Sequence, residues 1–139
     1  MRYLLDTHAL VWLLSSQDDL LPLRIRESIR YCEDAFFVCE MTLAEIIQLQ
    51  QGGRINLNYR PTVVREIIED NNIMIVSATN DILEKFFDLP IPIVNGNKHS
   101  DPFDRIIIST AIKRNMTVIS ADRKFPWYRD NCNLQLLEI

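Results

Sequence analysis

The sequence has only two histidines and three cysteines, and neither residue type is spaced as metal ligands usually are. His8 and His99 lie far apart, and Cys32, Cys39 and Cys132 form no C-x-x-C pair. Zinc is therefore a poor fit, because its sites are built from clustered Cys and His. An odd number of cysteines also argues against a disulfide framework. We expect all three to be small buried residues with reduced thiols, in a cytoplasmic protein.

The chain also lacks a long apolar run, an internal repeat and a long linker. The N-terminal stretch MRYLLDTHALVWLL is apolar, but Asp6 and His8 interrupt it and no small-residue cleavage pattern follows. It is too short and too polar to span a membrane, and it does not fit a signal peptide. With 139 residues, 47% of them hydrophobic and 24% charged, the chain fits one globular domain over residues 1–139.

The charge of the chain is distributed unevenly. The net charge of −4 argues at first against a nucleic-acid partner. Residues 1–97 carry 8 Lys and Arg against 14 Asp and Glu, whereas residues 98–139 carry 7 against 5. The C-terminal cations could therefore hold a phosphate backbone. Lys113 and Arg114 are the exception, because solvated positions in the last turn of a helix explain them.

Short apolar runs alternate with helical patterns along the whole chain. This alternation is typical of an α/β fold with a mostly parallel central sheet flanked by helices. The apolar runs predict strands at 3–6, 36–39, 73–76, 117–121 and 134–139. Periodicity, prolines and capping residues predict helices at 9–14, 22–32, 42–51, 61–71, 80–90 and 101–116. The segment PIPIVNGNKHS at 90–100 predicts a loop.

Three aspartates lie at the ends of apolar segments, where packing alone does not explain them. Asp6 follows the first strand, Asp122 follows the strand at 117–121, and Asp104 stands at the start of IIISTAI. Ligands of α/β sheets bind at the carboxyl ends of parallel strands, so Asp6 and Asp122 converge if their strands are neighbours. Each acid also has a simpler interpretation: a helix cap for Asp6, a favourable dipole position for Asp104 and an exposed turn for Asp122.

The helix that carries Asp104 indicates where its carboxylate points. Asp104 shares one helix face with Ile108 and Ala111, which directs it to the side of the core. Asp101, followed by Pro102, is explained as the N-cap of the same helix.

A cluster of carboxylates requires a positive partner. Burying one without a partner costs several kcal/mol, and two of them about 4 Å apart repel by about 4 kcal/mol at an effective dielectric near 20. A divalent cation relieves both costs, and a donor set made only of oxygens favours Mg²⁺ or Mn²⁺. A further acid is ambiguous: spacing does not separate Glu45, at a capping-box distance from Thr42, from Glu40, which ends a strand.

The chain resembles the PIN-domain ribonucleases in four segments that occur in that family's order and spacing: DTHALVWLL at 6–14, LAEI at 43–46, HSDPFDRIIISTAI at 99–112 and TVISADRKF at 117–125. The resemblance covers essentially the full length and is closest to the VapC-type toxins of prokaryotic toxin–antitoxin pairs. It implies a PIN-like fold and a metal-dependent endoribonuclease.

The resemblance also assigns roles to four acids. Asp6, Asp104 and Asp122 would bind Mg²⁺ (or Mn²⁺) directly, and Glu45, chosen over Glu40 because the family's acid is helical, would complete the site or orient water. The hydrolysis would leave 5′-phosphate and 3′-hydroxyl ends without a serine, cysteine or histidine nucleophile.

The partners implied by the resemblance are an RNA substrate, a cognate antitoxin protein whose segment fills the acidic groove, and a second copy in a homodimer. No membrane is involved. Trp127 and Tyr128 are candidates for an exposed contact patch, whereas core packing is the expectation for Trp12.

Four side chains near the acids have more modest expected roles. Thr7 and Ser120 could orient carboxylates, although local backbone hydrogen bonds are the simpler expectation. We expect His8 to be packed or hydrogen-bonded, and His99 to approach a substrate phosphate at most.

Two other functions fit part of the pattern. A non-catalytic PIN-like module could bind RNA or protein and keep an acidic pocket. A receiver-type phosphoacceptor domain is also a small α/β fold with an acidic Mg²⁺ pocket, but it needs paired acids after the first strand and an Asp after a central strand. The chain has a single Asp6 and then Glu40 at these positions.

Overall fold

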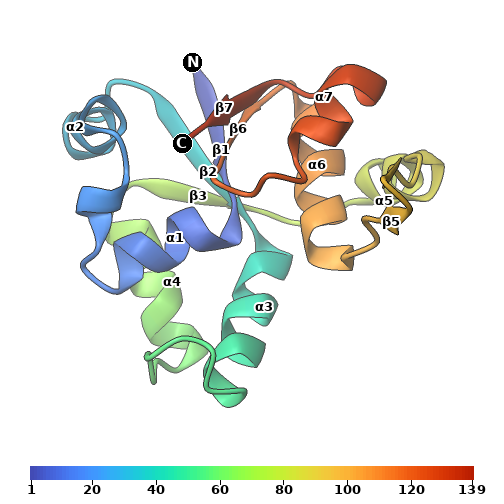
Figure 1. Cartoon of the computed structure of the whole chain (residues 1–139). Helices are drawn as coiled ribbons and strands as arrows, with labels where there is room; N and C mark the ends of the chain where they lie inside the picture. Colours follow the sequence, from blue (N-terminus) through green and yellow to red (C-terminus); the bar gives the residue numbers. More distant parts are fainter.

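A parallel five-stranded sheet forms the centre of the computed structural model, which describes residues 1–139 (Figure 1). The strands lie in the order β3-β2-β1-β6-β7. Their bounds are Arg2–Leu5 for β1, Ala35–Cys39 for β2, Ile73–Val76 for β3, Thr117–Ser120 for β6 and Leu136–Glu138 for β7. All five strands expected from the apolar runs are present, and the predicted α/β class is confirmed.

Helices cover both faces of the sheet. Their bounds are Thr7–Leu14 for α1, Leu23–Tyr31 for α2, Glu40–Gln51 for α3, Pro61–Asp70 for α4, Asn80–Asp88 for α5, Pro102–Arg114 for α6 and Pro126–Cys132 for α7, with a short 3₁₀ helix at Asp18–Leu20. Helices α1 to α4 pack on one face and α5 to α7 on the other (Figure 1). Successive strand residues enter opposite cores: Tyr3 and Leu5 the first, Leu4 the second.

The register of β1 brings the expected acidic positions together. β1 lies between β2 and β6, with Leu4 opposite both Phe37 and Val118. Asp6 comes directly after β1, and its backbone N–H donates to the carbonyl of Ile119 at 3.2 Å. The carboxyl ends of β1 and β6 are therefore adjacent, which is the condition under which Asp6 and Asp122 converge.

The start of α3 differs from the expectation. The helix begins at Glu40, directly after β2, with Cys39 as its N-cap residue. Thr42 lies inside the helix and is 1% exposed, so it caps nothing and the predicted capping box with Glu45 is wrong. The strand turns into the helix without a connecting loop, which moves the N-cap three residues upstream and places Glu45 in the second turn.

Four short elements were not expected from the sequence: the 3₁₀ helix, β4, β5 and α7. The segment predicted as a loop contains an antiparallel hairpin of β4 (Ile93–Val94) and β5 (Asn97–Lys98). Asn95 and Gly96 form its turn, both with positive φ (52° and 77°), as a tight hairpin turn requires. Helix α7 follows β6, begins at Pro126 and brings Tyr128 into the second core.

The three cysteines are free thiols. Cys39 is buried and Cys132 half-buried, but Cys32 is exposed, so the expectation of a buried residue is wrong there. Cys32 follows the last residue of α2 in a left-handed conformation (φ 54°), which turns it away from the core. No helix of the structure combines the length and the apolar character needed to span a membrane.

Candidate active site

Asp6 lies at the base of the candidate site and is only 3% exposed. One carboxylate oxygen accepts a hydrogen bond from the backbone N–H of Ala9 at 2.8 Å, so Asp6 is the N-cap of α1, as one interpretation of the sequence expected. The other oxygen accepts from the hydroxyl of Ser120. Despite these bonds, burial raises the pKa of Asp6 to about 6, because desolvation disfavours the charged form more than the two bonds favour it.

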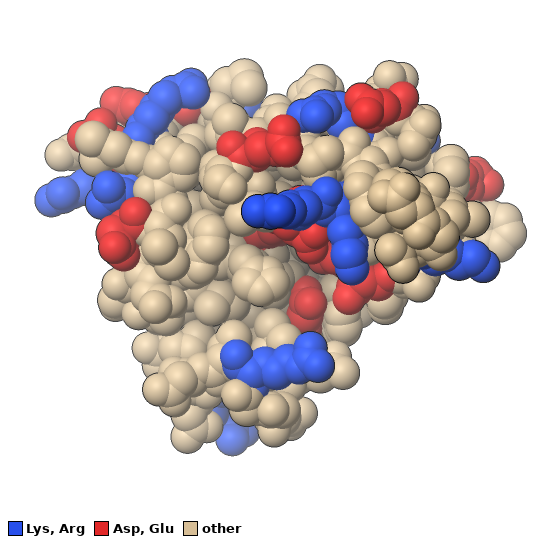
Figure 2. Space-filling model, viewed as in Figure 1, with Lys and Arg blue, Asp and Glu red and all other residues tan.

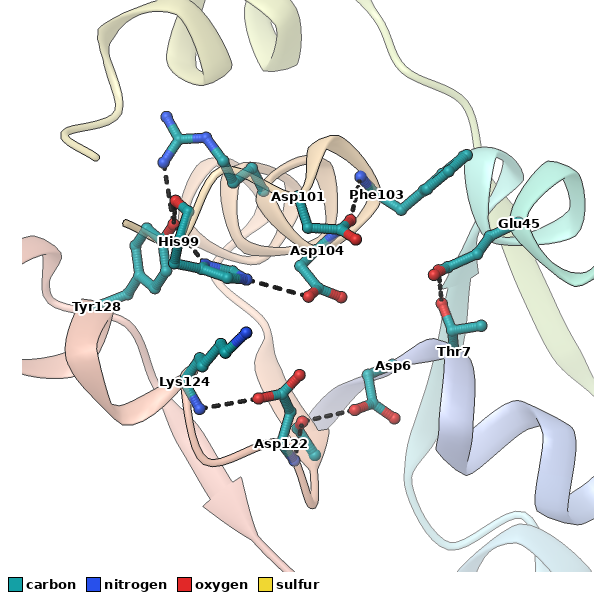
Figure 3. Close-up of polar contacts among 12 residues, drawn as sticks. Asp6, Thr7, Glu45, His99, Asp101, Phe103, Asp104, Asp122, Lys124 and Tyr128 are labelled. Atoms are coloured by element: carbon teal, nitrogen blue, oxygen red, sulfur yellow. Dashed lines mark hydrogen bonds and ion pairs between the residues drawn. The ribbon is translucent and has the colours of Figure 1, made fainter. Parts of the chain in front are cut away.

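Ser120 links Asp6 to Asp122. Its hydroxyl donates to Asp6 and accepts from the backbone N–H of Asp122 at 3.0 Å. Asp122 in turn accepts from the backbone N–H of Lys124 at 2.8 Å, which fixes the turn after β6 (Figure 3). Ser120 thus orients a carboxylate and also makes the local backbone bond that was the simpler expectation.

Glu45 enters the site from α3. It accepts a hydrogen bond from the hydroxyl of Thr7, which follows Asp6 in the chain (Figure 3). Burial is the main reason why the pKa of Glu45 is raised, and the negative charges of Asp104 and Asp101 add to it. Glu40 instead lies on the exposed start of α3. The structure therefore brings Glu45, and not Glu40, to the other acids.

Asp104 lies in the first turn of α6. Asp101 caps this helix as expected, accepting from the backbone N–H groups of Phe103 at 2.9 Å and Asp104 at 3.1 Å. The Asp104 carboxylate is 18% exposed, and its Oδ2 lies 3.1 Å from Nε2 of His99. Burial raises the pKa of Asp104, the hydrogen bond with His99 lowers it, and the charges of Asp101 and Asp122 raise it further.

The structure corrects the expectations for three neighbouring side chains. His99 is 2% exposed, its Nδ1 lies 2.8 Å from the hydroxyl of Tyr128 and its Nε2 lies 3.1 Å from Asp104, so both ring nitrogens have partners within the chain and neither is free for a substrate phosphate. Tyr128 is fully buried and contributes nothing to an exposed patch. His8 is exposed and lines the site instead of being packed. Trp12 packs against the first core, as expected, and remains partly exposed.

A cavity of about 540 Å³ opens above these groups, with acidic side chains visible in the hollow of Figure 2. It is lined by Glu45, Asp101, Asp104 and Asp122, together with His8, Leu49, Arg54, Ile55, His99 and Lys124. Asp6 is too deeply buried to line it. Lys and Arg side chains flank the hollow on both sides in the same view.

The donor chemistry of the site suits a hard divalent cation. The four acids point toward one space from four separate segments (Figure 3), and burial or mutual repulsion raises the pKa of Asp6, Glu45 and Asp104. Carboxylate oxygens in this situation are ligands that Mg²⁺ and Mn²⁺ prefer. The carboxylates do not form a closed cluster, since no three acidic, histidine or cysteine side chains are close enough to enclose an ion. Binding of an ion would need these side chains to move closer together.

Comparison with known proteins identifies the fold family. The family model of the PIN domain matches residues 3–130. Among solved structures, VapBC2 from Rickettsia felis bound to a promoter DNA fragment matches with a TM-score of 0.64 and 18% identity over 99% of this chain and 98% of that one. VapBC-1 from nontypeable Haemophilus influenzae matches with a TM-score of 0.60 and 21% identity, and VapBC-5 from Mycobacterium tuberculosis with 0.58 and 17%, both over 99% of this chain and 98% of those chains.

These identities establish similarity of fold alone. No curated protein sequence matches the chain significantly. The family match nevertheless spans nearly the whole sequence, and the receiver-type alternative is excluded by it. The expectation drawn from the four sequence segments is confirmed: the chain belongs to the PIN-domain family.

Proposed function

We propose that this protein is a metal-dependent endoribonuclease and the toxin of a VapC-type toxin–antitoxin pair. The proposal depends on one observation: Glu45, Asp104 and Asp122 from three distant segments line a single cavity at the carboxyl end of a PIN-domain sheet, and Asp6 is buried at its base. The similar structures are VapBC toxin–antitoxin complexes, which supports the assignment as a toxin. The whole chain, residues 1–139, would act as one domain.

In this proposal Asp6, Asp104 and Asp122 hold Mg²⁺ (or Mn²⁺), and Glu45 completes the site or orients the attacking water. The bound cation would lower the pKa of that water and stabilise charge on the scissile phosphate. The chain supplies the orientation: Ser120 holds Asp6 and the backbone of Asp122, and Thr7 holds Glu45. The depth of Asp6 keeps its carboxylate out of bulk water, which strengthens its attraction to a cation.

An antitoxin is the protein partner that the fold neighbours favour. Its segment would fill the acidic cavity and place an Arg or Lys against the carboxylates, where a cation relieves their repulsion. We also propose the homodimer that the family resemblance implies.

The nuclease proposal predicts different effects for two glutamates of α3. Glu45→Gln should lower the rate of RNA cleavage by roughly 10²-fold or more, because it removes a charge from the site. Glu40→Gln should leave the rate unchanged, because Glu40 is exposed and pairs with Arg65 at 3.2 Å outside the cavity. Cleavage of RNA by purified protein in Mg²⁺ or Mn²⁺ should stop in EDTA and yield 5′-phosphate ends.

The nuclease proposal is wrong if the folded wild-type protein binds RNA but does not cleave it in Mg²⁺ or in Mn²⁺. That outcome would favour the non-catalytic PIN-like module. If Glu45→Gln and Glu40→Gln lower the rate of RNA cleavage equally, Glu45 has no special role in the site.

Two unpaired cations supply a means of holding RNA. Arg54 and Lys124 are exposed and line the acidic cavity, and neither forms an ion pair within the chain. Lys124 comes from the turn after β6. Arg54 comes from the segment after α3, where it also lines two adjoining hollows. Phosphates on either side of the scissile one would therefore meet positive charge, although the cavity itself is acidic.

Salt dependence tests these contacts without cleavage. In EDTA, Arg54→Gln and Lys124→Gln should each weaken binding of single-stranded RNA and reduce the slope of log K against log salt concentration by about 0.7. Lys113→Gln is the matched control, because Lys113 is exposed at the far end of α6, away from the cavity. Slopes that do not differ from that of the control would exclude Arg54 and Lys124 as phosphate contacts.

A further inference from the structure

A buried chain of polar side chains lies directly behind Asp104. It joins α6, the segment before α6 and α7 through Arg105, His99 and Tyr128, which are 6%, 2% and 0% exposed. Nothing in the proposed chemistry uses these three residues. Polar groups buried this deeply are retained only where their hydrogen bonds are satisfied, so the donor and the acceptor of each bond follow from the chemistry of the groups.

Arg105 fixes the first direction, because a guanidinium only donates. It donates to the carbonyls of Pro90 at 3.0 Å and Leu89 at 2.7 Å, and to the hydroxyl oxygen of Tyr128 at 2.9 Å. The single proton of Tyr128 must then point elsewhere. Its nearest acceptor is Nδ1 of His99 at 2.8 Å, closer than the His99 carbonyl at 3.3 Å.

The direction of that bond determines the tautomer of His99. If Nδ1 accepts from Tyr128, the ring proton of the neutral imidazole is on Nε2. Nε2 lies 3.1 Å from Oδ2 of Asp104, which as a carboxylate only accepts. The bonds therefore run in one sense, from Arg105 through Tyr128 and His99 to Asp104 (Figure 3).

Packing keeps the His99 ring in this orientation. Tyr128, Trp127 and Phe125 surround it, with ring centroids 5.4, 6.5 and 6.5 Å away. Rotation of the ring would move Nε2 away from Asp104 and into these aromatic side chains. Oδ1 of Asp104, in contrast, accepts no hydrogen bond from another side chain, so one oxygen is held and the other is free.

We propose that His99 is a positioning residue for the metal site, with its Nε2–H tautomer fixed by Tyr128 and Arg105 so that it holds Oδ2 of Asp104 and leaves Oδ1 for the cation. This rests on the proposed metal-dependent function. It assigns His99 no contact with substrate or metal. Such outer hydrogen bonds to a ligand are worth about 10- to 100-fold in metal affinity.

The first test reads the tautomer in the metal-free protein. Nitrogen-15 NMR of the imidazole should show a protonated Nε2 and an unprotonated Nδ1 in the wild type. Tyr128→Phe keeps the ring but removes the hydroxyl, so Nδ1 loses its donor and the wild-type tautomer should no longer be fixed. A wild-type ring protonated on Nδ1 would overturn the proposal, whether or not the protein cleaves RNA.

The second test measures Mn²⁺ affinity in two amide variants. The amide nitrogen of Gln reaches roughly the place of Nε2, whereas that of Asn reaches only that of Nδ1. His99→Gln should therefore stay within a few-fold of the wild-type Mn²⁺ affinity, and His99→Asn should lose about 10-fold or more. Equal affinities in both folded variants would reduce His99 to core packing. If His99→Asn does not fold, the Mn²⁺ affinity of Tyr128→Phe decides: a loss supports the proposal and an unchanged value contradicts it.

Discussion

Replacement of Asp6 by Asn is expected to stabilise the metal-free protein at pH 7 and at the same time to abolish RNA cleavage. The gain in the free energy of unfolding should be roughly 1–3 kcal/mol. Most substitutions of a buried residue destabilise a protein. A gain at this position would therefore indicate that the carboxylate is kept for function at the expense of stability.

The sign follows from the raised pKa of Asp6. Burial moves it from 3.8 to about 6, so between these pH values the folded state binds more protons than the unfolded state. The free energy of unfolding of the metal-free wild type therefore falls as the pH rises from about 4 to about 6, and it stays lower above that range. Asn carries no charge and has no such dependence.

The hydrogen bonds of Asp6 are compatible with Asn. The amide oxygen can still accept from the backbone N–H of Ala9, and the amide nitrogen can donate to Ser120. The Ser120 hydroxyl already accepts from the backbone of Asp122 but has a second lone pair. The substitution thus removes the charge. The Ser120 hydroxyl proton, which Asp6 accepts in the wild type, needs another acceptor in the variant, and this cost offsets part of the gain.

Urea denaturation from pH 4 to pH 8 in EDTA measures the effect. Asp19→Asn is the control, since Asp19 is exposed and forms no side-chain hydrogen bond or ion pair. Adding Mg²⁺ should stabilise the wild type and not Asp6→Asn, because only the wild type would bind the ion. An Asn variant less stable than the wild type at pH 7, or a difference that does not shrink toward pH 4, would show that desolvation does not dominate at Asp6.

The convergence of Asp6 and Asp122 could be predicted from the sequence because it follows from a local rule. Each acid ends an apolar strand, and parallel neighbouring strands present their carboxyl ends at the same edge. Asp104 could be assigned by the same kind of reasoning, since its helix face is set by spacing. In the structure Asp104 and Asp122 line the cavity, and Asp6 is buried at its base.

Glu45 required the family resemblance, because no periodic pattern encodes its partner. Its contact with Thr7 spans 38 positions and depends on where α3 starts, and the sequence placed the N-cap of α3 three residues too late. The residue at which the helix starts sets the direction in which each helical side chain points relative to the preceding strand, and each residue of error changes that direction by about 100°. The choice between Glu45 and Glu40 could not be made from spacing for this reason.

The His99 network was missed for a different reason. The bond between His99 and Tyr128 joins positions 29 apart, and α7, which carries Tyr128, is too short to give a clear periodic signal. One signal was present: Arg105 precedes three isoleucines in a helix whose neighbouring positions are buried. A cation in such a place needs fixed acceptors, which would have pointed to a polar network nearby.

Replacement of Arg105 by Met is expected to lower the free energy of unfolding by about 2–4 kcal/mol. The side chain is 6% exposed and donates three hydrogen bonds, two of them to the carbonyls of Leu89 and Pro90 that precede the hairpin. It also lies against the rings of Phe86 and Tyr128, with the guanidinium carbon 5.7 and 5.9 Å from their centroids. Met fills much of the volume but leaves these acceptors without a donor.

Arg129→Met is the matched control, because Arg129 is exposed on α7 and forms one surface ion pair with Glu138 at 2.9 Å. Its loss should cost less than about 1 kcal/mol. Hydrogen exchange should locate the damage of Arg105→Met in the segment from Leu89 to His99, since Arg105 ties that segment to α6. If urea denaturation shows that both variants lose the same free energy of unfolding, the buried guanidinium of Arg105 does not stabilise this part of the fold. Arg105 then does not hold Tyr128 and His99 in place behind Asp104.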